Sequence, residues 1–439
     1  MNGHAYPRYK RYKDSGVDWL GTIPERWEVA PLFHLLRERF VRNTGNRVRD
    51  VLSLSYGRIV PRDVDTNFGL LPESFETYQI AEPGNIVLRL TDLQNDRRSL
   101  RVGHVTHRGI ITSAYVNLET VSGLDNRFAY YLLNAYDLLK VFYGMGAGVR
   151  QTMKFDDLKR MPCVLPSRPE QEVIARFLDR ETARIDALIE KQERLIEKLE
   201  EKRKAQTSKA VTQGLNPKAK MKDSGVDWLG RIPEHWTTPP LYSRYSVELG
   251  KMLDAKTNTG KCSMPYLRNT DVQWDAINIA GLKEMDIMSD EYERFTLKNG
   301  DLLVCEGGDV GRAAMWRGPL ATCGYQKALH RMRALRSDEF VRYMYYVFFT
   351  VAYLGVFLSN SNPNTIAHLT GEKLRVYRFP KPPLSEQVSI AENLDANIQR
   401  IDRMIGAVDQ LLMSLSEKRT AMISAAVTGK IDVRKVANG

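Results

Sequence analysis

The residues that could carry catalysis or hold a cofactor do not form a recognisable constellation in this sequence. The glycines of 144–148 follow a predicted helix rather than a strand, and the third one is misplaced for a dinucleotide-binding turn. The stretch 307–311 lacks the lysine of a phosphate-binding loop, and 362–364 is not followed by the aromatic residue that amino-methyltransferases stack on a flipped base. His104 and His107 have no third metal ligand nearby. We therefore expect no catalytic residue and no metal site in this chain.

Basic and amide side chains in predicted loops offer a different chemistry, the binding of nucleic acid. Phosphate contacts need Lys or Arg, and base edges favour Arg, Asn, Gln or Lys. The candidates are Arg89, Arg97, Arg98, Arg101, Arg150, Gln151 and Lys154 in the first half, and Arg268, Asn269, Arg312, Lys327, Asn362, Asn364 and Thr365 in the second. A plain solvated surface role is the alternative for each of them. The net charge of +11, spread along the chain, suits a nucleic-acid partner without requiring one.

The elements that would position these loops begin with one long predicted helix, residues 170–212. This stretch contains neither proline nor glycine, and its apolar residues follow a heptad pattern with charged flanks. The two predicted seam rows are Leu178, Ile185, Gln192 and Leu199, and Glu181, Leu188, Leu195 and Lys202, and Ile189 and Ile196 widen the stripe. At 1.5 Å per residue such a helix is about 64 Å long, so it needs a partner helix.

A second copy of this helix occurs 216 residues later, from 386 to 429. Its seam rows are Leu394, Ile401, Val408 and Leu415, and Asn397, Met404, Leu411 and Lys418. Polar residues match as well: Glu170-Gln171 with Glu386-Gln387, Asp179 with Asp395, Asp186 with Asp402, and 201–203 with 417–419. Two unrelated amphipathic helices of similar period are the alternative, but matching polar residues at a constant offset argue against it.

A short turn-rich segment also repeats, at an offset of 209. Lys13–Trp27 and Lys222–Trp236 are identical at thirteen of fifteen positions. Its apolar anchors include Trp19 and Trp27, with Trp228 and Trp236 in the second copy. These side chains either pack on the helix pair or form a docking surface, and both interpretations stay open.

The residues between these repeats predict two divergent α+β domains. Strand-like runs occur at 50–56, 86–90 and 102–106, and helices are predicted at 128–142 and 340–358. The resulting order is two cycles of turn segment, variable domain and long helix. The predicted boundaries are 1–27 (turn segment), 28–165 (first variable domain), 166–214 (first long helix), 215–236 (linker and second turn segment), 237–382 (second variable domain), 383–430 (second long helix) and 431–439 (tail).

The sequence predicts a cytoplasmic protein. The four cysteines are scattered without a CxxC pair, so neither a zinc site nor a disulfide framework is indicated. The first residues lack the apolar core of a signal peptide. The stretch 340–358 approaches the length of a membrane span with Arg342 as its one charge, but the equivalent first-half helix carries Asn134, Asp137 and Lys140. We therefore expect a core helix there.

This architecture resembles the specificity subunit of Type I restriction–modification systems. The resemblance rests on KDSGVDWLGxIPExW, on LPSRPEQEVIARFLD with PPLSEQVSIAENLD, and on EKRKAQTSKAVTQG with EKRTAMISAAVTG. These motifs cover about a quarter of the chain, and the two-cycle order covers all of it. The variable domains match in layout only.

The resemblance implies a non-catalytic DNA-recognition subunit with a pseudo-twofold internal repeat. Each variable domain would be a target recognition domain that reads one half of a bipartite double-stranded DNA sequence. The two helices would pair antiparallel, separate these domains and set the gap. Helices and turn segments would dock two methylation subunits and, through them, restriction subunits. S-adenosylmethionine, ATP and Mg²⁺ would belong to those partners.

Two other classes of protein remain open from the sequence. One is a protein-interaction scaffold that uses its helices as coiled-coil rods and reads no DNA. It has no need of basic loops and gives no reason for the variable domains to diverge. The other is an enzyme with an unrecognised site, which would show activity as an isolated chain.

Overall fold

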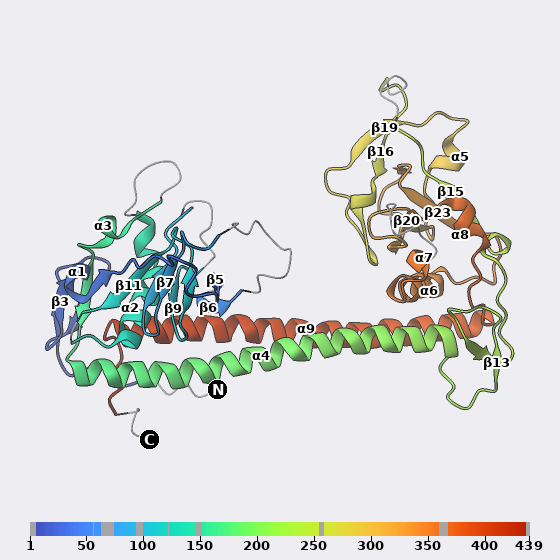
Figure 1. Ribbon diagram of the computed structural model, residues 1–439. Helices are drawn as coiled ribbons and strands as arrows, with labels where there is room; N and C mark the ends of the chain where they lie inside the picture. The colour runs from blue at the N-terminus through green and yellow to red at the C-terminus, as the bar shows by residue number, and fades with distance from the viewer. Residues whose placement is uncertain are drawn as a thin grey trace. The chain divides into compact units, whose positions relative to one another are not determined.

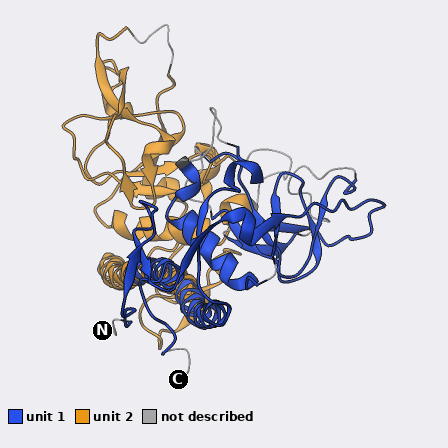
Figure 2. Cartoon of the chain, turned by 90° about the vertical axis from the view of Figure 1, so that its left-hand side faces the viewer, with its two compact units in different colours: residues 1–193, 409–439 blue, residues 194–408 orange. Residues whose placement is uncertain are grey.

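A computed structural model describes residues 6–55, 57–62, 74–93, 100–121, 123–144, 152–253, 259–359 and 368–435. The chain forms two compact units (Figure 2): unit 1 holds residues 1–193 and 409–439, and unit 2 holds residues 194–408. Each unit contains one turn segment, one variable domain and part of each long helix. The variable domains 28–165 and 237–382 are called head 1 and head 2 below.

Unit 1 is built on a four-stranded antiparallel sheet that α2 (Asn126–Leu138) covers. Its strand order is β4 (Leu36–Glu38), β11 (Val116–Thr120), β8 (Ile86–Leu88) and β9 (Val102–His104). The remaining elements of the unit are β1 (Tyr12–Asp14), β2 (Thr22–Pro24), β3 (Glu28–Pro31), α1 (Leu32–Leu35), β5 (Leu52–Ser55), β6 (Arg58–Pro61), β7 (Gln79–Ala81), β10 (Gly109–Ile111), η1 (Val141–Gly144), α3 (Phe155–Leu158) and β12 (Pro162–Leu165).

Unit 2 repeats this layout with α6 (Val341–Tyr353) against its sheet. The strand order is β15 (Tyr245–Leu249), β23 (Leu329–Ala334), β20 (Leu302–Cys305) and β21 (Ala313–Met315). The remaining elements are β13 (Met221–Asp223), β14 (Arg231–Pro233), η2 (Leu241–Ser243), β16 (Ser263–Leu267), η3 (Asn269–Asp271), β17 (Val272–Gln273), β18 (Ala276–Ile277), β19 (Lys283–Asp286), α5 (Tyr292–Phe295), β22 (Gly324–Tyr325), α7 (Val356–Ser359) and α8 (Gly371–Val376). Both sheets place their strands in the chain order first, fourth, second, third, so the two heads share a fold.

The apolar stretch near residue 340 is a core helix, as the sequence predicts. Helix α6 is buried on several sides. Its buried side chains are Tyr343, Met344, Tyr345, Tyr346, Val347, Phe348, Thr350 and Val351. All of them except Thr350 pack with the sheet and with the turn segment of unit 2 in one hydrophobic cluster. None of the helices in the described part of the chain combines the length and the hydropathy that crossing a membrane requires.

The long helices α4 (Arg168–Gln213) and α9 (Leu384–Val427) run antiparallel (Figure 1). In unit 1, Arg419 of α9 donates to Asp186 of α4 at 2.8 Å. In unit 2, Arg203 of α4 donates to Asp402 of α9 at 3.1 Å. Asp186 and Asp402 are 216 residues apart, as are Arg203 and Arg419, so the same cross-helix pair occurs once in each unit.

The second predicted seam row is wrong by one residue in both helices. The apolar side chains that it contains are exposed: Leu188 by 40%, Leu195 by 38%, Met404 by 43% and Leu411 by 38%. The row one residue further along is less exposed in both helices: 182, 189, 196 and 203 in α4, and 398, 405, 412 and 419 in α9. Thr182 can occupy this row because its hydroxyl donates to the carbonyl of Leu178 at 2.7 Å and needs no water.

Each head begins and ends at one place. In head 1, β3 pairs antiparallel with β12, so Glu28 lies opposite Leu165. In head 2, the backbone N–H of Lys381 donates to the carbonyl of Thr237 at 2.8 Å, and the reverse bond measures 3.3 Å. The polypeptide therefore leaves the turn segment, forms the head and returns to the same point before the long helix starts.

The turn segments pack against the ends of the long helices. Gly214, with a φ of +75°, follows α4, and a Cβ there would stand 3.2 Å from the ring of the buried Trp236. Gly429, with a φ of +72°, follows α9, and a Cβ there would stand 3.1 Å from the ring of the buried Trp27. These glycines allow close approach as well as a left-handed backbone. For Trp27 and Trp236 the packing interpretation therefore holds.

Candidate nucleic-acid interface

Head 2 gathers several of its predicted DNA-contacting residues at the ends of neighbouring strands. Arg268 and Asn269 follow β16, which pairs in parallel with β22, and the exposed Lys327 follows β22. The loop between β20 and β21 comes to the same edge, because the N–H of Glu306 donates to the carbonyl of Ala328 at 3.0 Å. Residues from four strands thus meet at one surface.

Arg312 clamps that loop rather than projecting from it. Its guanidinium donates to the amide oxygen of Asn269 at 2.8 Å and to the Asn269 carbonyl at 3.1 Å. Asn269 in turn donates to the carbonyl of Gly307 at 2.8 Å. The Arg312 side chain is only 16% exposed, whereas Gly308 and Asp309 form the exposed part of the loop. The clamp therefore fixes the backbone that this surface presents.

Arg268 is partly neutralised by a neighbour and remains partly exposed. Its guanidinium bonds to the two carboxylate oxygens of Asp271 at 2.8 and 2.6 Å, and 33% of its side chain is exposed. Burial opposes the charge of Asp271, but the hydrogen bonds from Arg268 outweigh burial and lower the pKa of this carboxyl. The Nε and Nη2 groups of Arg268 are already bonded to Asp271, and the exposed part of its guanidinium can still contact a phosphate.

Head 1 brings fewer of its candidates together among the described residues. The half-buried Arg89 follows β8, and the exposed Lys154 precedes α3. They lie close in space because the N–H of Met153 donates to the carbonyl of Leu90 at 2.9 Å. This edge of head 1 therefore offers two cations. The candidates that lie outside the described residues are Arg97, Arg98, Arg150, Gln151, Asn362, Asn364 and Thr365.

Arg101 corrects the sequence prediction, because it is fully buried at 0% exposure. Its guanidinium donates to the carbonyls of Thr91 at 2.6 Å and Asp92 at 3.2 Å, and its backbone N–H donates to Asp137 at 2.6 Å. A buried arginine with its donors directed at carbonyls organises the turn after β8 and does not reach DNA.

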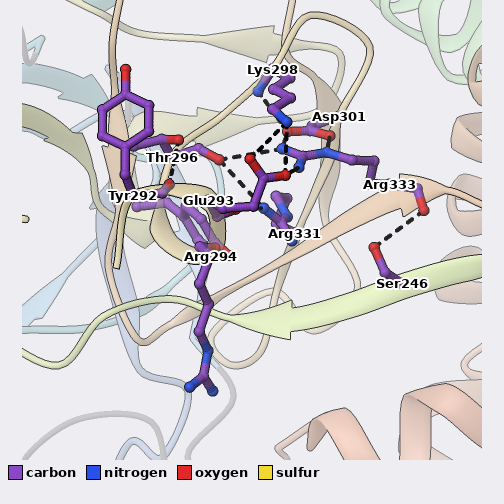
Figure 3. A network of polar contacts seen from close by, with 10 residues as sticks. Ser246, Tyr292, Glu293, Arg294, Thr296, Lys298, Asp301, Arg331 and Arg333 are labelled. Atoms are coloured by element: carbon purple, nitrogen blue, oxygen red, sulfur yellow. Dashed lines mark hydrogen bonds and ion pairs between the residues drawn. The ribbon is translucent and has the colours of Figure 1, made fainter. Parts of the chain in front are cut away.

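Two arginines of β23 are bound within head 2 and do not add to the basic surface (Figure 3). Arg333 holds Asp301 through two bonds of 2.8 Å and reaches Glu293 at 3.1 Å. Arg331 donates to the carbonyl of Glu293 at 3.0 Å. Lys298 also bonds to Glu293, at 2.7 Å, and this bond is the main cause that lowers the pKa of the Glu293 carboxyl. The network pairs Arg333 and Lys298 with carboxylates of head 2, while Arg331 bonds to backbone carbonyls.

Two substitutions in head 2 are expected to separate the clamp from a phosphate contact. Arg312→Ala removes two charged hydrogen bonds and should lower the free energy of unfolding by about 2 kcal/mol, while relaxing discrimination between DNA sequences. Lys327→Ala should leave the free energy of unfolding within about 0.5 kcal/mol of the wild-type value. It should weaken binding to all sequences alike, and the slope of log affinity against log salt concentration should be smaller by about 1. Thermal unfolding and DNA binding at several salt concentrations measure both effects.

The opposite results would reassign these residues. If Arg312→Ala changed neither unfolding nor discrimination, the clamp would have no role in presenting the loop. If Lys327→Ala left the salt slope at the wild-type value, Lys327 would be an ordinary solvated side chain.

The sequence prediction missed a pair of residues that both heads use to contact their long helix. Arg127 and Tyr131 of α2 contact α4, and Arg342 and Tyr346 of α6 contact α9. Their signal is the pair RFAYY, starting at residue 127, and RYMYY, starting at residue 342. The pattern recurs at an offset of 215, between the 209 of the turn segments and the 216 of the long helices.

Comparison with known proteins finds similarity to one family. Residues 236–407 match the model of the Type I restriction modification DNA specificity domain. The EcoBI specificity subunit of a Type I restriction enzyme from Escherichia coli is 30% identical over 214 residues, which cover 48% of this chain and 42% of that protein. The EcoKI specificity subunit from Escherichia coli strain K12 is 23% identical over 290 residues, 63% of this chain and 58% of that protein. The chain thus spans about half the length of these curated relatives.

Other likenesses extend over nearly the whole chain. The putative Type I restriction enzyme MjaX specificity subunit from Methanocaldococcus jannaschii is 23% identical over 94% of this chain and 96% of its own length. A chain solved in work on complex assembly and conformational transition of the type I R-M system has a TM-score of 0.70 at 14% identity, covering 92% of this chain and 98% of that one. The HsdS subunit from Thermoanaerobacter tengcongensis has a TM-score of 0.50 at 15% identity, covering 93% and 98%. These structures establish the shared fold.

Proposed function

We propose that this chain, whose residues 236–407 belong to the Type I restriction modification DNA specificity family, is the sequence-specific DNA-binding subunit of a Type I restriction–modification complex. One observation carries the proposal: two heads with the same strand order differ almost completely in sequence between constant flanks. A scaffold that stays constant while its two exposed domains vary suits a protein that reads two different half-sites. In this proposal the long helices set the gap between them.

The DNA-facing surface in this proposal is the clamped edge of head 2 and the corresponding edge of head 1. Arg268 and Lys327 of head 2, with Arg89 and Lys154 of head 1, supply cations for phosphates. The loop that Arg312 holds carries the base-reading function together with candidates outside the described residues. Arg97, Arg98, Arg150, Gln151, Asn362, Asn364 and Thr365 stay proposed contacts.

The partners in this proposal are two methylation subunits, which dock on the turn segments and long helices. Support comes from exposed apolar side chains beside the helix seam. Leu188 and Met404 are equivalent at the offset of 216, and so are Leu195 and Leu411. Trp19 adds a further 39% exposed anchor. Unit 1 carries Leu188 and Leu411, and unit 2 carries Leu195 and Met404. One such pair in each unit suits two copies of one partner, which in turn bring restriction subunits.

Catalysis in this proposal belongs to those partners. Methyl transfer with S-adenosylmethionine, and ATP hydrolysis with Mg²⁺, require motifs that this sequence lacks. The isolated chain is therefore expected to show no methyltransferase, nuclease or ATPase activity. Methyl transfer by the purified chain, with contaminating partner excluded by mass spectrometry, would contradict this assignment.

The decisive test is sequence-dependent binding of duplex DNA. Sequencing the methylome of cells that carry the system first gives the modified target. The purified chain with its methylation partner should then bind a duplex containing that target on the order of 10³-fold more tightly than a scrambled duplex at physiological salt. The interaction-scaffold alternative predicts equal binding to the two duplexes, and that result would overturn the proposal.

A further inference from the structure

Polar contacts connect head 1 to α4, and those at Gln171 and Asp179 of the helix recur in unit 2. The buried Gln171 accepts from the backbone N–H of Asp125, the residue that precedes α2, at 2.9 Å. Two turns further along α4, Asp179 accepts from the hydroxyl of Tyr131 at 2.9 Å and from the guanidinium of Arg127 at 2.9 Å. The start of α2 is thereby fixed to one face of the long helix.

Head 2 is mounted on α9 through the equivalent residues. The buried Gln387 accepts from the backbone N–H of Phe340, which precedes α6, at 2.9 Å. Asp395 accepts from the hydroxyl of Tyr346 at 2.6 Å and from Nε of Arg342 at 2.9 Å. The glutamine and the aspartate recur at the offset of 216, and the arginine and the tyrosine recur at 215. We call each set of Asp, Arg and Tyr a latch.

The two latches differ in how tightly they enclose the arginine. Arg342 is 13% exposed and also bonds to Asp275, which lies in the turn between β17 and β18 of head 2. Arg127 is 38% exposed, and its second carboxylate, Asp125, is 3.8 Å away. The latch of head 2 therefore connects helix α9 to two separate elements of the head.

Each head shares a hydrophobic core with its long helix, and this packing restrains the head without directional bonds. Hydrogen bonds to a charged group are short and directional, so they select one orientation among those that packing permits. Arg and Tyr four residues apart project from the same face of a helix and reach one carboxylate together. A latch thus restrains the head from rotating around its long helix or sliding along it.

We propose that Asp179 and Asp395 are positioning residues, each of which sets the orientation in which one head meets its half-site. This inference rests on the proposed function, since it assigns each latch to one half of a bipartite target. It also gives a rule for exchangeable heads: a head must present Arg and Tyr four residues apart at the start of its helix. A head without this pair would fold and keep the bond to the helix glutamine, but it would lose the directional bonds to the aspartate.

The test uses Asp395→Asn in the full chain assembled with its methylation partner. Binding is measured to a duplex that carries the motif methylated by the wild-type system. It is also measured to duplexes in which one base pair of either half-site is changed. Discrimination against changes in the half-site of head 2 should fall by about tenfold or more, the scale of one good base contact, while the other half-site is unaffected. Asp179→Asn should produce the mirror result.

Controls separate positioning from stability. Glu392→Gln makes the same charge change at an exposed position one turn earlier on α9 and should alter nothing. Tyr346→Phe removes one bond to Asp395 but keeps the ring packing, so it should give a smaller loss confined to the same half-site. A merely structural residue would lower the unfolding temperature and reduce binding to all duplexes alike by lowering the active fraction.

The outcomes are distinct. Loss confined to one half-site in Asp395→Asn or in Tyr346→Phe supports the latch. Equal loss at both half-sites in both variants, or wild-type discrimination in both, overturns it. If the wild-type assembly itself fails to discriminate between duplexes, the proposed function is what fails, independently of the latch.

Discussion

A chain with one extra heptad in α4 is expected to methylate a target whose half-sites lie one to three base pairs further apart. Seven residues inserted between Leu195 and Lys202 return every seam residue to its own face. They lengthen the helix by about 10 Å, which corresponds to roughly three base pairs at 3.4 Å each. Because α9 keeps its length in this variant, the gap between the half-sites is expected to widen by less than the full change of about three base pairs. The half-site sequences themselves should not change.

The measurement is the methylated motif in cells that carry each variant. A matched chain with heptads in both helices, the second after Asp409, should reach the full change of about three pairs. An insertion of three residues turns the following seam residues away from the partner and should lower stability or abolish assembly. An active enzyme that keeps its original gap after the heptad insertion would show that the helices do not set the spacing.

Exchange of head 2 for the head of a related chain should replace one half-site and leave the other intact. Residues 237–382 are a suitable segment because Thr237 and Lys381 pair with each other, so the exchange leaves the junction with Trp236 and α9 unchanged. The donor head must supply the Arg and Tyr of the latch. Methylome sequencing of cells carrying the hybrid gives the new target.

A donor that lacks the latch pair serves as the matched control for this exchange. It should yield a folded chain with weak or absent modification of either motif. If a latch-bearing hybrid altered both half-sites, the heads would not read DNA independently, and the division of the target between them would be wrong.

The sequence predicted the scaffold well because its signals are local. Long stretches without Pro or Gly, a heptad period and a turn segment repeated almost unchanged are visible without knowledge of tertiary contacts. The phase of the seam was not predictable in the same way. A seven-residue repeat is compatible with a step of three or of four residues, and both rows contain polar residues. The hydrogen bond of Thr182 and the cross-helix pair of Arg203 select the four-residue step, and both depend on the folded structure.

The candidate site was harder to predict, since its residues come from strands far apart in the chain. Arg268, Lys327 and Arg312 look alike as basic loop residues. The parallel pairing of β16 with β22 brings together the strand ends that Arg268 and Lys327 follow, and the bonds to Asn269 bring Arg312 there. Arg101 lies in a polar stretch of sequence, but the carbonyls and the Asp137 carboxylate that surround it bury it. The latch was not predicted from the sequence because loops of unequal length change the offset between repeats. It is 209 for the turn segments, 215 for the latch Arg and Tyr, and 216 for the long helices.

The composition of the two units has a consequence for the order of events during synthesis. Unit 2 is one continuous stretch, residues 194–408, so it can close while the ribosome is still translating the end of the chain. Unit 1 cannot, because its core requires Met422, Ile423, Val427 and Val433 from the second half of α9 and the residues beyond it. The first head to emerge is therefore the last to be completed, and until then its turn segment and α4 expose apolar surface that invites aggregation or chaperone binding. A nascent chain that stops after residue 408 would carry a complete second unit beside a first unit that stays open.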